Sequence, residues 1–415
     1  MEKKRGTLEL FHYIDLVVAV TFVLVQVRLS QLLVRAARRK LYGTRRRLAF
    51  SGIVAFNLIL LTAYGLGLKA QADQLHSWPV AATMLSAVCL LYLMVAAAVL
   101  ILHGVLQMFH RPLKTVVDTG RRRLLSAAGG AVLAAPFAVV SYGVLIERLD
   151  FHVREIEIPI PSLPPDLEGL RIAQISDIHL SPFLRESDLA RVIDATNQLR
   201  PHLVAITGDL ITQRGDPLDA AIRQLARLRA DAGLFGCMGN HEKFARVQDY
   251  TQAAAARVGI RFLRRANATL RFGSASLNLA GLDYQSKALK AHYLSGADRL
   301  MVPDAVNILL QHNPDTFPAA ARQGYNLLLA GHTHGGQVTI EILDESISPA
   351  RFFTPYVYGL YPDPDGRPGL FAYVTRGIGT IAIPARVGAP PEIALLRLRG
   401  APAKAPSESA GAGRA

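Results

Sequence analysis

The sequence is poor in cysteine and in charge, and both shortages exclude classes of protein. Of its 415 residues only two are cysteines, Cys89 and Cys237, and only 19% carry a charge. Cys89 lies in a long apolar stretch, so Cys237 has no partner in the rest of the chain and a disulfide scaffold is excluded. Since 51% of the residues are hydrophobic, disorder over most of the chain is excluded too.

Positive charge is concentrated in the first third of the chain. The net charge is +14, yet residues 151–400 hold 26 basic and 24 acidic side chains, whereas residues 1–150 hold 18 and 7. Binding to a nucleic-acid backbone requires a basic surface on the folded part of a protein. The near balance after residue 150 therefore predicts that no nucleic acid is a partner.

Four apolar stretches precede residue 150, and we expect each to cross a membrane as a helix. Their bounds are about 10–27, 48–68, 79–102 and 124–146. About 20 apolar residues suffice to span a bilayer, and the last three stretches carry no charge. The first contains Asp15, which makes it the weakest of the four because a carboxyl group is costly in hydrocarbon. A lipid bilayer is thus an expected partner.

Basic residues between these stretches predict the orientation. Two loops carry twelve of them, namely Arg35, Arg38, Arg39, Lys40, Arg45, Arg46, Arg47, Arg111, Lys114, Arg121, Arg122 and Arg123. Loops of this kind stay in the cytoplasm, so both termini are expected outside. The run 119–125 also resembles a twin-arginine export signal in an internal position, with an ordinary basic stop as the alternative. Both readings predict a multi-pass protein of a bacterial inner membrane with the following domain on the periplasmic side.

The pattern changes after residue 150 to that of an α/β domain. Alternation predicts a half-buried strand at 153–160, and short apolar runs predict strands at 170–175, 203–207, 234–237, 277–280, 306–310, 327–330 and 338–342. Helices are predicted at 186–199, 217–230 and 250–258, the first with Leu189, Val192, Ile193 and Thr196 on one face. This alternation predicts an α/β sandwich with a central mixed sheet. We therefore expect a membrane region at 1–150, a globular domain at 151–400 and a disordered tail at 401–415.

Side chains that bind metals follow several of these strands. They are Asp177 and His179, Asp209, Asn240 and His241, His312, and His332 and His334. Alternate residues of an extended segment point the same way, so the Asp-x-His and His-x-His pairs are each expected to reach one small site. Imidazole nitrogens with carboxylate and amide oxygens, and no thiolate, suit Mn, Fe, Zn or Ni.

In this order the motifs Asp-x-His, Gly-Asp, Gly-Asn-His-Glu, His and Gly-His-Thr-His resemble the calcineurin-like metallophosphoesterase superfamily over about 170 to 340. The runs 374–379 and 390–393 resemble its membrane-associated branch, which includes UDP-2,3-diacylglucosamine hydrolase-like proteins and transmembrane proteins with a metallophosphoesterase domain. The resemblance implies a four-layer α/β/β/α metallophosphoesterase sandwich.

The resemblance also implies a dinuclear metal centre. Asp177, His179 and His334 would bind the first divalent ion, Asn240, His312 and His332 would bind the second, and Asp209 would bridge them. His241 would be the catalytic residue that protonates the leaving oxygen or stabilises the phosphoryl group. Glu242 either supports the ligands from behind or begins a solvated helix. The implied reaction is hydrolysis of a phosphodiester or pyrophosphate by a hydroxide that two metal ions activate.

Three functions compete. The first is a membrane-anchored phosphohydrolase of lipid metabolism, with manganese as a candidate metal and a lipid-linked substrate such as UDP-2,3-diacylglucosamine, as in lipid A biosynthesis. That substrate conflicts with the orientation, because nucleotide-activated lipids are expected in the cytoplasm; phospholipid headgroups or other phosphodiesters would suit an exported enzyme. The second is a non-catalytic metal-bound sensor or scaffold. Loss of metal ligands would indicate it, and no ligand position of the motifs is lost. The third is transport, which the lack of intramembrane charge other than Asp15 disfavours.

Overall fold

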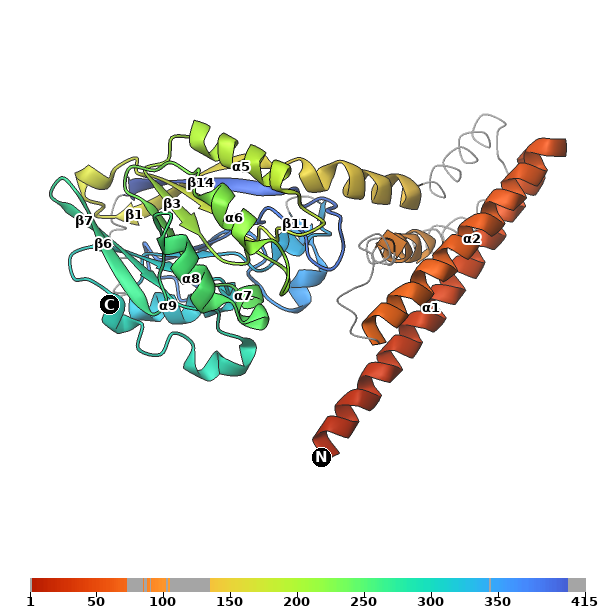
Figure 1. The fold of residues 1–415 in the computed structure, drawn as a ribbon, viewed down its shortest axis with the longest axis horizontal. Helices are drawn as coiled ribbons and strands as arrows, with labels where there is room; N and C mark the ends of the chain where they lie inside the picture. Colours follow the sequence, from red (N-terminus) through yellow and green to blue (C-terminus); the bar gives the residue numbers. More distant parts are fainter. Residues whose placement is uncertain are drawn as a thin grey trace, which may run out of the picture. The chain divides into compact units, whose positions relative to one another are not determined.

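The computed structural model describes residues 2–72, 85, 88–89, 91–101, 104, 135–342 and 345–401. The chain divides into two compact units, one of Met1–Ile146 with Ala382–Ala385 and one of Glu147–Ile381 with Arg386–Ala415. The first is helical and the second is an α/β unit (Figure 1). The expected disordered tail, apart from its first residue, lies outside the described residues.

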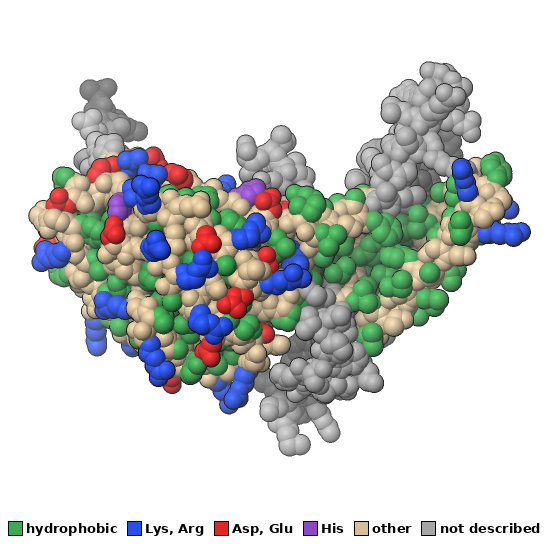
Figure 2. Space-filling model, turned by 45° about the horizontal axis from the view of Figure 1, so that its top comes forward, with side chains coloured by type: hydrophobic (Ala, Val, Ile, Leu, Met, Phe, Trp, Pro, Cys, Tyr) green, Lys and Arg blue, Asp and Glu red, His purple; other side chains and the backbone are tan. Residues whose placement is uncertain are grey.

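Two long helices form the described core of the smaller unit, α1 (Glu2–Lys40) and α2 (Gly43–Ala72). Gln26 Nε2 and Ser30 Oγ on α1 donate to Asn57 Oδ1 on α2 over 3.0 and 3.2 Å. Polar bonds of this kind join helices whose other surroundings are apolar. Figure 2 shows hydrophobic side chains along the helical pair and basic side chains gathered at the end where α1 and α2 join.

Among the described residues two helical segments, rather than the four expected, are long and apolar enough to cross a membrane. They are Val20–Arg39 and Gly43–Ala63. The first overlaps the expected stretch 10–27 from Val20 onward, and the side chains before Val20, Asp15 among them, lie outside the description. Of the stretch 79–102 the structure describes residues 85 and 88–89 and the shorter apolar helix Leu91–Ile101. Of 124–146 it describes only the part from residue 135. The two segments suggest membrane association.

The larger unit contains two six-stranded mixed sheets, not the single central sheet that the apolar runs predicted. The first has the order β1 (His152–Pro161), β14 (Glu392–Ala401), β2 (Arg171–Ile175), β3 (Leu203–Ile206), β4 (Leu234–Gly236), β5 (Ile260–Phe262). The second has the order β12 (Gly359–Pro362), β13 (Phe371–Val374), β9 (Leu327–Ala330), β8 (Val306–Leu310), β7 (Ala275–Gly281), β6 (Ala266–Phe272). A separate hairpin pairs β10 (Ile340–Ile342) with β11 (Glu345–Ile347).

Three apolar cores hold these layers together. The inner faces of the two sheets share one core, to which Ile172 of β2 and Ile308 of β8 belong. The outer face of the first sheet packs against α5 (Glu186–Gln198), α6 (Leu218–Leu225) and α8 (Gln248–Ala256). The outer face of the second packs against α9 (Phe317–Gln323). Figure 1 shows the resulting α/β/β/α order that the resemblance implied.

Short helices fill the connections between these elements. They are α7 (Asn240–Ala245) and the 3-10 helices η2 (Glu147–Leu149), η3 (Pro165–Leu167), η4 (Lys287–His292), η5 (Asp298–Leu300), η6 (Pro314–Thr316), η7 (His334–Gly336) and η8 (Pro349–Phe352). The helix predicted at 186–199 is confirmed: α5 buries Leu189, Val192 and Ile193, as their helical spacing predicts. The helix predicted at 217–230 ends at Leu225, and the strand predicted at 338–342 begins at Ile340.

Strand direction decides where the functional motifs meet. Strands β2, β3 and β4 run parallel, so their carboxyl ends lie at one edge of the first sheet. Strands β8 and β9 run parallel in the second sheet. Every metal-binding motif follows directly on one of these five strands. Loops at such edges are held by a rigid sheet and commonly form binding sites.

Candidate metal centre

The structure brings the predicted site residues together. Three groups of side chains have ligand atoms within 4.8 Å of one another, namely Asp177 with His179 and His334, Asp209 with His312 and His332, and His179 with Asp209 and His241. The eighth predicted residue, Asn240, is adjacent to His241 at the start of α7. Residues from five loops of two different sheets thus converge on one small volume.

Asp209 lies between the two ligand groups. Its Oδ2 is 2.9 Å from Nε2 of His312 and 3.6 Å from Nε2 of His179. Asp177 Oδ1 is 3.4 Å from Nε2 of His334. Two ligands that each bind one ion at about 2.1 Å lie roughly 3 to 3.5 Å apart. The side chains are therefore already spaced as ligands of shared ions, with Asp209 placed to serve both.

The backbone at these positions is left-handed, which the sequence did not predict. Asp177, His179, Asp209, His332 and His334 have φ of 51°, 47°, 57°, 76° and 53°. The expectation that the Asp-x-His and His-x-His pairs converge because the segments are extended was therefore wrong. They converge because left-handed turns aim the side chains. Each such residue costs about 1–3 kcal/mol and persists only where its surroundings hold it, and such positions cluster at functional sites.

Backbone hydrogen bonds between the loops hold these turns. Asp177 N donates to Gly208 O and His179 N donates to Asp209 O, both over 3.0 Å. Gly331 N donates to His312 O over 3.1 Å. Each bond joins one ligand-bearing loop to the next, so the ligand positions depend on one another.

Two glycines leave room for the ligand carboxylates. A Cβ at Gly239 would lie 2.0 Å from Asp209 Oδ1, and a Cβ at Gly331 would lie 2.2 Å from Asp177 Oδ2. The Gly-Asn-His and Gly-His-Thr-His motifs thus require glycine because the carboxylates occupy the space of a side chain.

Glu242 supports the centre from behind, the first of the two roles left open above. It is fully buried and accepts backbone N–H groups of Asp209 at 3.0 Å, Leu210 at 2.6 Å and Gly239 at 2.8 Å. Burial and the nearby Asp209 charge raise the pKa of Glu242 to about 7, against the effect of these three donors. One carboxyl group thereby joins the loop after β3 to the loop after β4.

The histidine rings are oriented by bonds through Nδ1. His312 Nδ1 lies 2.6 Å from Thr207 O, His241 Nδ1 lies 2.5 Å from Thr212 O, and His179 Nδ1 lies 3.1 Å from Thr212 Oγ1. A carbonyl oxygen can only accept, so Nδ1 of His312 and of His241 carries the proton. The proton on Nδ1 leaves Nε2 as the ligating or reacting atom.

Burial sets the charge of most of these rings. It lowers the pKa of His179 to about 3 and that of His332 to about 4, and it lowers the pKa of His334 well below its usual value. His312 differs, because the Asp209 and Asp177 carboxylates outweigh its burial and raise its pKa to about 10. Neutral imidazoles are the form that binds metals.

These donors fit a pair of divalent cations. Nε2 of His179 and Oδ1 of Asn240 are buried without a hydrogen-bond partner, although buried polar atoms normally have one. Asp177 and Asp209 are buried beside them, and buried carboxylates call for positive charge. The clustered Asp and His residues indicate a dinuclear divalent metal site, whose nitrogen and oxygen donors suit Mn, Fe, Zn or Ni.

Two further residues shape the site without any signal in the sequence. Thr212 contacts both His179 and His241, as described above. Arg386 is fully buried and donates to backbone carbonyls that include His334 O and Ala389 O, over 3.3 and 3.0 Å. No motif marks either residue, because Thr212 meets its two imidazole partners only in the folded chain and Arg386 binds backbone carbonyls, which leave no pattern in the sequence.

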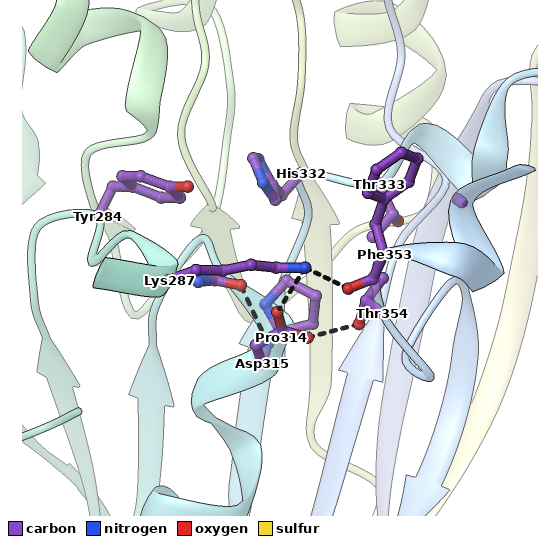
Figure 3. Close-up of a pocket in the computed structure, with 10 residues that line it drawn as sticks. Tyr284, Lys287, Pro314, Asp315, His332, Thr333, Phe353 and Thr354 are labelled. Atoms are coloured by element: carbon purple, nitrogen blue, oxygen red, sulfur yellow. Dashed lines mark hydrogen bonds and ion pairs between the residues drawn. The ribbon is translucent and has the colours of Figure 1, made fainter. Parts of the chain in front are cut away.

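A cavity of about 200 Å³ adjoins the centre. It is lined by Tyr284, Lys287, Asn313, Pro314, Asp315, His332, Thr333, Ala350, Phe353 and Thr354. Figure 3 shows the Lys287 side chain reaching across it toward the Phe353 carbonyl and Asp315, with Tyr284 and His332 facing the same space. The ring centroids of Tyr284 and His332 are 5.2 Å apart. The cavity therefore offers aromatic walls directly beside a predicted metal ligand.

Replacing Glu242 tests the support that it gives. We expect Glu242→Ala to lower the free energy of unfolding by about 3 kcal/mol or more, since three buried N–H groups lose their acceptor at about 1–3 kcal/mol each. Glu186→Ala, at an exposed position that begins α5, is the control and is expected to change it by less than about 0.5 kcal/mol. Urea unfolding followed by circular dichroism measures both; equal midpoints would refute the role of Glu242.

The raised pKa of His312 predicts a proton release. At pH 7 this ring keeps its proton in the metal-free protein, whereas His179 and His332 are already neutral, so binding of Mn²⁺ must displace about one proton at His312. The apparent affinity should then rise with pH by up to about tenfold per unit. Isothermal titration of the metal-free protein with Mn²⁺, repeated in buffers of different ionisation enthalpy, gives the number of protons released on metal binding.

The matched variants for this titration are His312→Asn, expected to release almost no proton, and His292→Asn. His292 is exposed on η4 and lies outside the centre, so its replacement should leave the count unchanged. Binding of Mn²⁺ without proton release at pH 7 in the unaltered protein would show the assigned charge of His312 to be wrong.

Comparison with known proteins places these motifs in a family. The family model of calcineurin-like phosphoesterases matches residues 170–336. A bovine (Bos taurus) transmembrane protein with metallophosphoesterase domain is 30% identical over 300 residues, which are 69% of this chain and 65% of that protein. An uncharacterized metallophosphoesterase of Campylobacter jejuni is 31% identical over 60% of this chain and 63% of its own length. The Bacillus subtilis metallophosphoesterase YkuE, also uncharacterized, is 29% identical over 67% of this chain and 97% of its own length.

The matched segment includes every predicted site residue, from Asp177 to His334. The chain spans slightly less than two thirds of the length of the first two of these relatives. The matched part, however, has the strands, the loops and the clustered ligands described above. Residues 170–336 therefore form a calcineurin-like metallophosphoesterase domain, the domain of hydrolases that act on phosphoric esters.

Proposed function

We propose that the protein is a membrane-anchored, metal-dependent phosphohydrolase that cleaves a phosphodiester or pyrophosphate bond. The observation that carries the proposal is the position of Asp209, which lies within reach of both ligand groups. In such a site two divalent cations activate water and stabilise the charge that develops on phosphoryl oxygens.

The chain's own residues would hold these ions and orient the reaction. Asp177, His179 and His334 would bind one ion, Asn240, His312 and His332 the other, with Asp209 shared. The bonds from Nδ1 fix His312 and His179 so that Nε2 faces the site. Glu242 and the two glycines keep Asp209 in place, so little reorganisation is needed when substrate binds.

His241 would act on the leaving group. A ring nitrogen of His241 lies within 4.8 Å of ligand atoms of both His179 and Asp209. Its Nδ1 is held by the carbonyl of Thr212, which leaves Nε2 to donate a proton to the leaving oxygen or to stabilise the phosphoryl group. The same position would also allow His241 to ligate a metal, and the experiment below separates the two roles.

A lipid-linked substrate fits this chain best. The helices α1 and α2 suggest membrane association, and the bovine relative is named as a transmembrane protein. The cavity beside His332, with Tyr284 and Phe353 in its walls, would receive the part of the substrate next to the scissile phosphate. UDP-2,3-diacylglucosamine and phospholipid headgroups are the two candidates, and the latter agrees with a domain on the periplasmic side, which the basic loops predict.

Two variants test the mechanism on full-length protein with added Mn²⁺. With bis(p-nitrophenyl) phosphate as substrate, we expect Asp209→Ala to abolish turnover and to lose bound metal. We expect His241→Ala to keep both ions and to lower kcat by about 10²- to 10⁴-fold, as loss of a general acid does. Elemental analysis and steady-state kinetics on the same samples give both quantities.

The exposed His292 supplies the control, since His292→Ala should retain both metal and activity. Loss of metal in His241→Ala would make His241 a ligand instead of an acid. Two bound ions without turnover of the diester or of UDP-2,3-diacylglucosamine in the unaltered protein would favour the metal-bound sensor or scaffold.

A further inference from the structure

The metal centre is bordered by the most exposed phenylalanines of its unit. Among the described side chains of the larger unit, the three most exposed large hydrophobic ones are Phe352 at 90%, Phe353 at 71% and Phe244 at 68%. The Phe244 ring centroid is 5.8 Å from that of His241. Phe353 lines the cavity that also contains His332 (Figure 3). Scattered exposed apolar residues are ordinary, but their concentration around one site indicates a partner there.

These phenylalanines lie on segments that otherwise present only positive charge. Phe244 belongs to α7, and Phe352 ends η8. Phe353 follows η8 and is reached across the cavity by Lys287 of η4. The exposed charged residues of these three helices are Lys243, Lys287, Lys290 and Arg351. Their one acidic residue, Glu242, is buried under α7. Since residues 151–400 are nearly balanced in charge, this excess is local to the site.

One basic residue on this border is already fixed in position. Lys287 Nζ lies 3.8 Å from Asp315 Oδ2 and 5.9 Å from the centroid of the Phe353 ring, and it donates to the Phe353 carbonyl. These contacts hold η4 against the segment after η8. By contrast η4 buries none of its side chains, so Leu289 and Lys290 face solvent.

We propose that Phe244, Phe352, Phe353 and the basic residues beside them form a surface that seats the active site on an anionic lipid bilayer. Aromatic rings prefer the level of the headgroups, and lysine and arginine beside them are attracted by anionic lipid. A bilayer suits this surface better than a protein partner, because the membrane association suggested by α1 and α2 keeps lipid at high local concentration. The proposal rests on the proposed function, because a lipid-binding surface is useful to an enzyme with a lipid-linked substrate, but binding of this surface to the bilayer can be measured without turnover.

The test uses a single tryptophan in the full-length protein. Trp78 is the sequence's only tryptophan, so Trp78→Phe provides a silent background for Phe352→Trp. In nanodiscs of brominated phosphatidylglycerol and phosphatidylcholine at equal parts, we expect the emission from position 352 to be quenched at least twofold and shifted to the blue. Adding Lys243→Glu and Lys290→Glu should remove most of this quenching.

Val258→Trp in the same background is the matched control. Val258 is 39% exposed and lies just before β5, at the amino edge of the first sheet, opposite the edge that carries the site. We expect no quenching there. Equal quenching at both positions, or no quenching at position 352, would overturn the proposal. No quenching at position 352 would indicate that a protein partner or another segment of this chain covers the exposed phenylalanines instead.

Hydrolysis of soluble bis(p-nitrophenyl) phosphate separates this proposal from the proposed function. Phe352 lines no part of the cavity, so Phe352→Ser should leave that activity within about twofold. Quenching at position 352 in a protein that hydrolyses neither the diester nor UDP-2,3-diacylglucosamine would retain the lipid surface and favour the sensor or scaffold over the enzyme. Hydrolysis without quenching would retain the enzyme and refute the surface.

Discussion

The centre depends on carboxyl groups that are buried beyond the reach of water. Asp177, Asp209 and Glu242 lie together with almost no exposure, which is unfavourable unless each is paired or hydrogen-bonded. Glu242 is satisfied by three backbone N–H groups, and Asp177 and Asp209 accept from the backbone of His332 and His241. These bonds fix the positions of the three carboxyl groups, and the cations that the site would hold would offset the charge that is buried there. The loops after the strands are therefore held in the conformations that satisfy these carboxyl groups.

Backbone strain follows from the same constraint. Five of the seven predicted ligands have a left-handed backbone, and the bonds between adjacent loops hold them there. A site assembled in this way gains precision from the sheets beneath it, because β3, β8 and β9 are buried throughout and β2 is buried from Ile172 onward. The stability of the two-sheet core therefore supports the strained turns at its edge.

The sequence predicted which side chains gather at the site better than it predicted the architecture that presents them. Strands β8 and β9 and the buried face of α5 were predicted correctly, because apolar runs and helical periodicity are local signals. The apolar runs predicted strands of both sheets without dividing them, and only the resemblance implied the second layer. Strands β12 and β13 of the second sheet and β14 of the first were not predicted, since partners such as β9 and β1 lie far away in the sequence. Left-handed turns and the buried Arg386 escaped prediction for the same reason: they are fixed by tertiary hydrogen bonds and leave no periodic trace.

The pairing of β14 has a consequence for how the protein is made. This strand, the last of the domain, inserts between β1 and β2 and pairs residue by residue with β1, from His152 with Glu392 to Pro161 with Ala401. Until the ribosome has released the segment around Glu392, β1 and β2 lack their common neighbour and the first sheet stays open. Such distant pairing slows folding and leaves strand edges exposed to other chains. The segment of β14 must therefore be synthesised before the first sheet beneath the metal centre can close, and a nascent chain that still lacks β14 would be a substrate for chaperones and proteases.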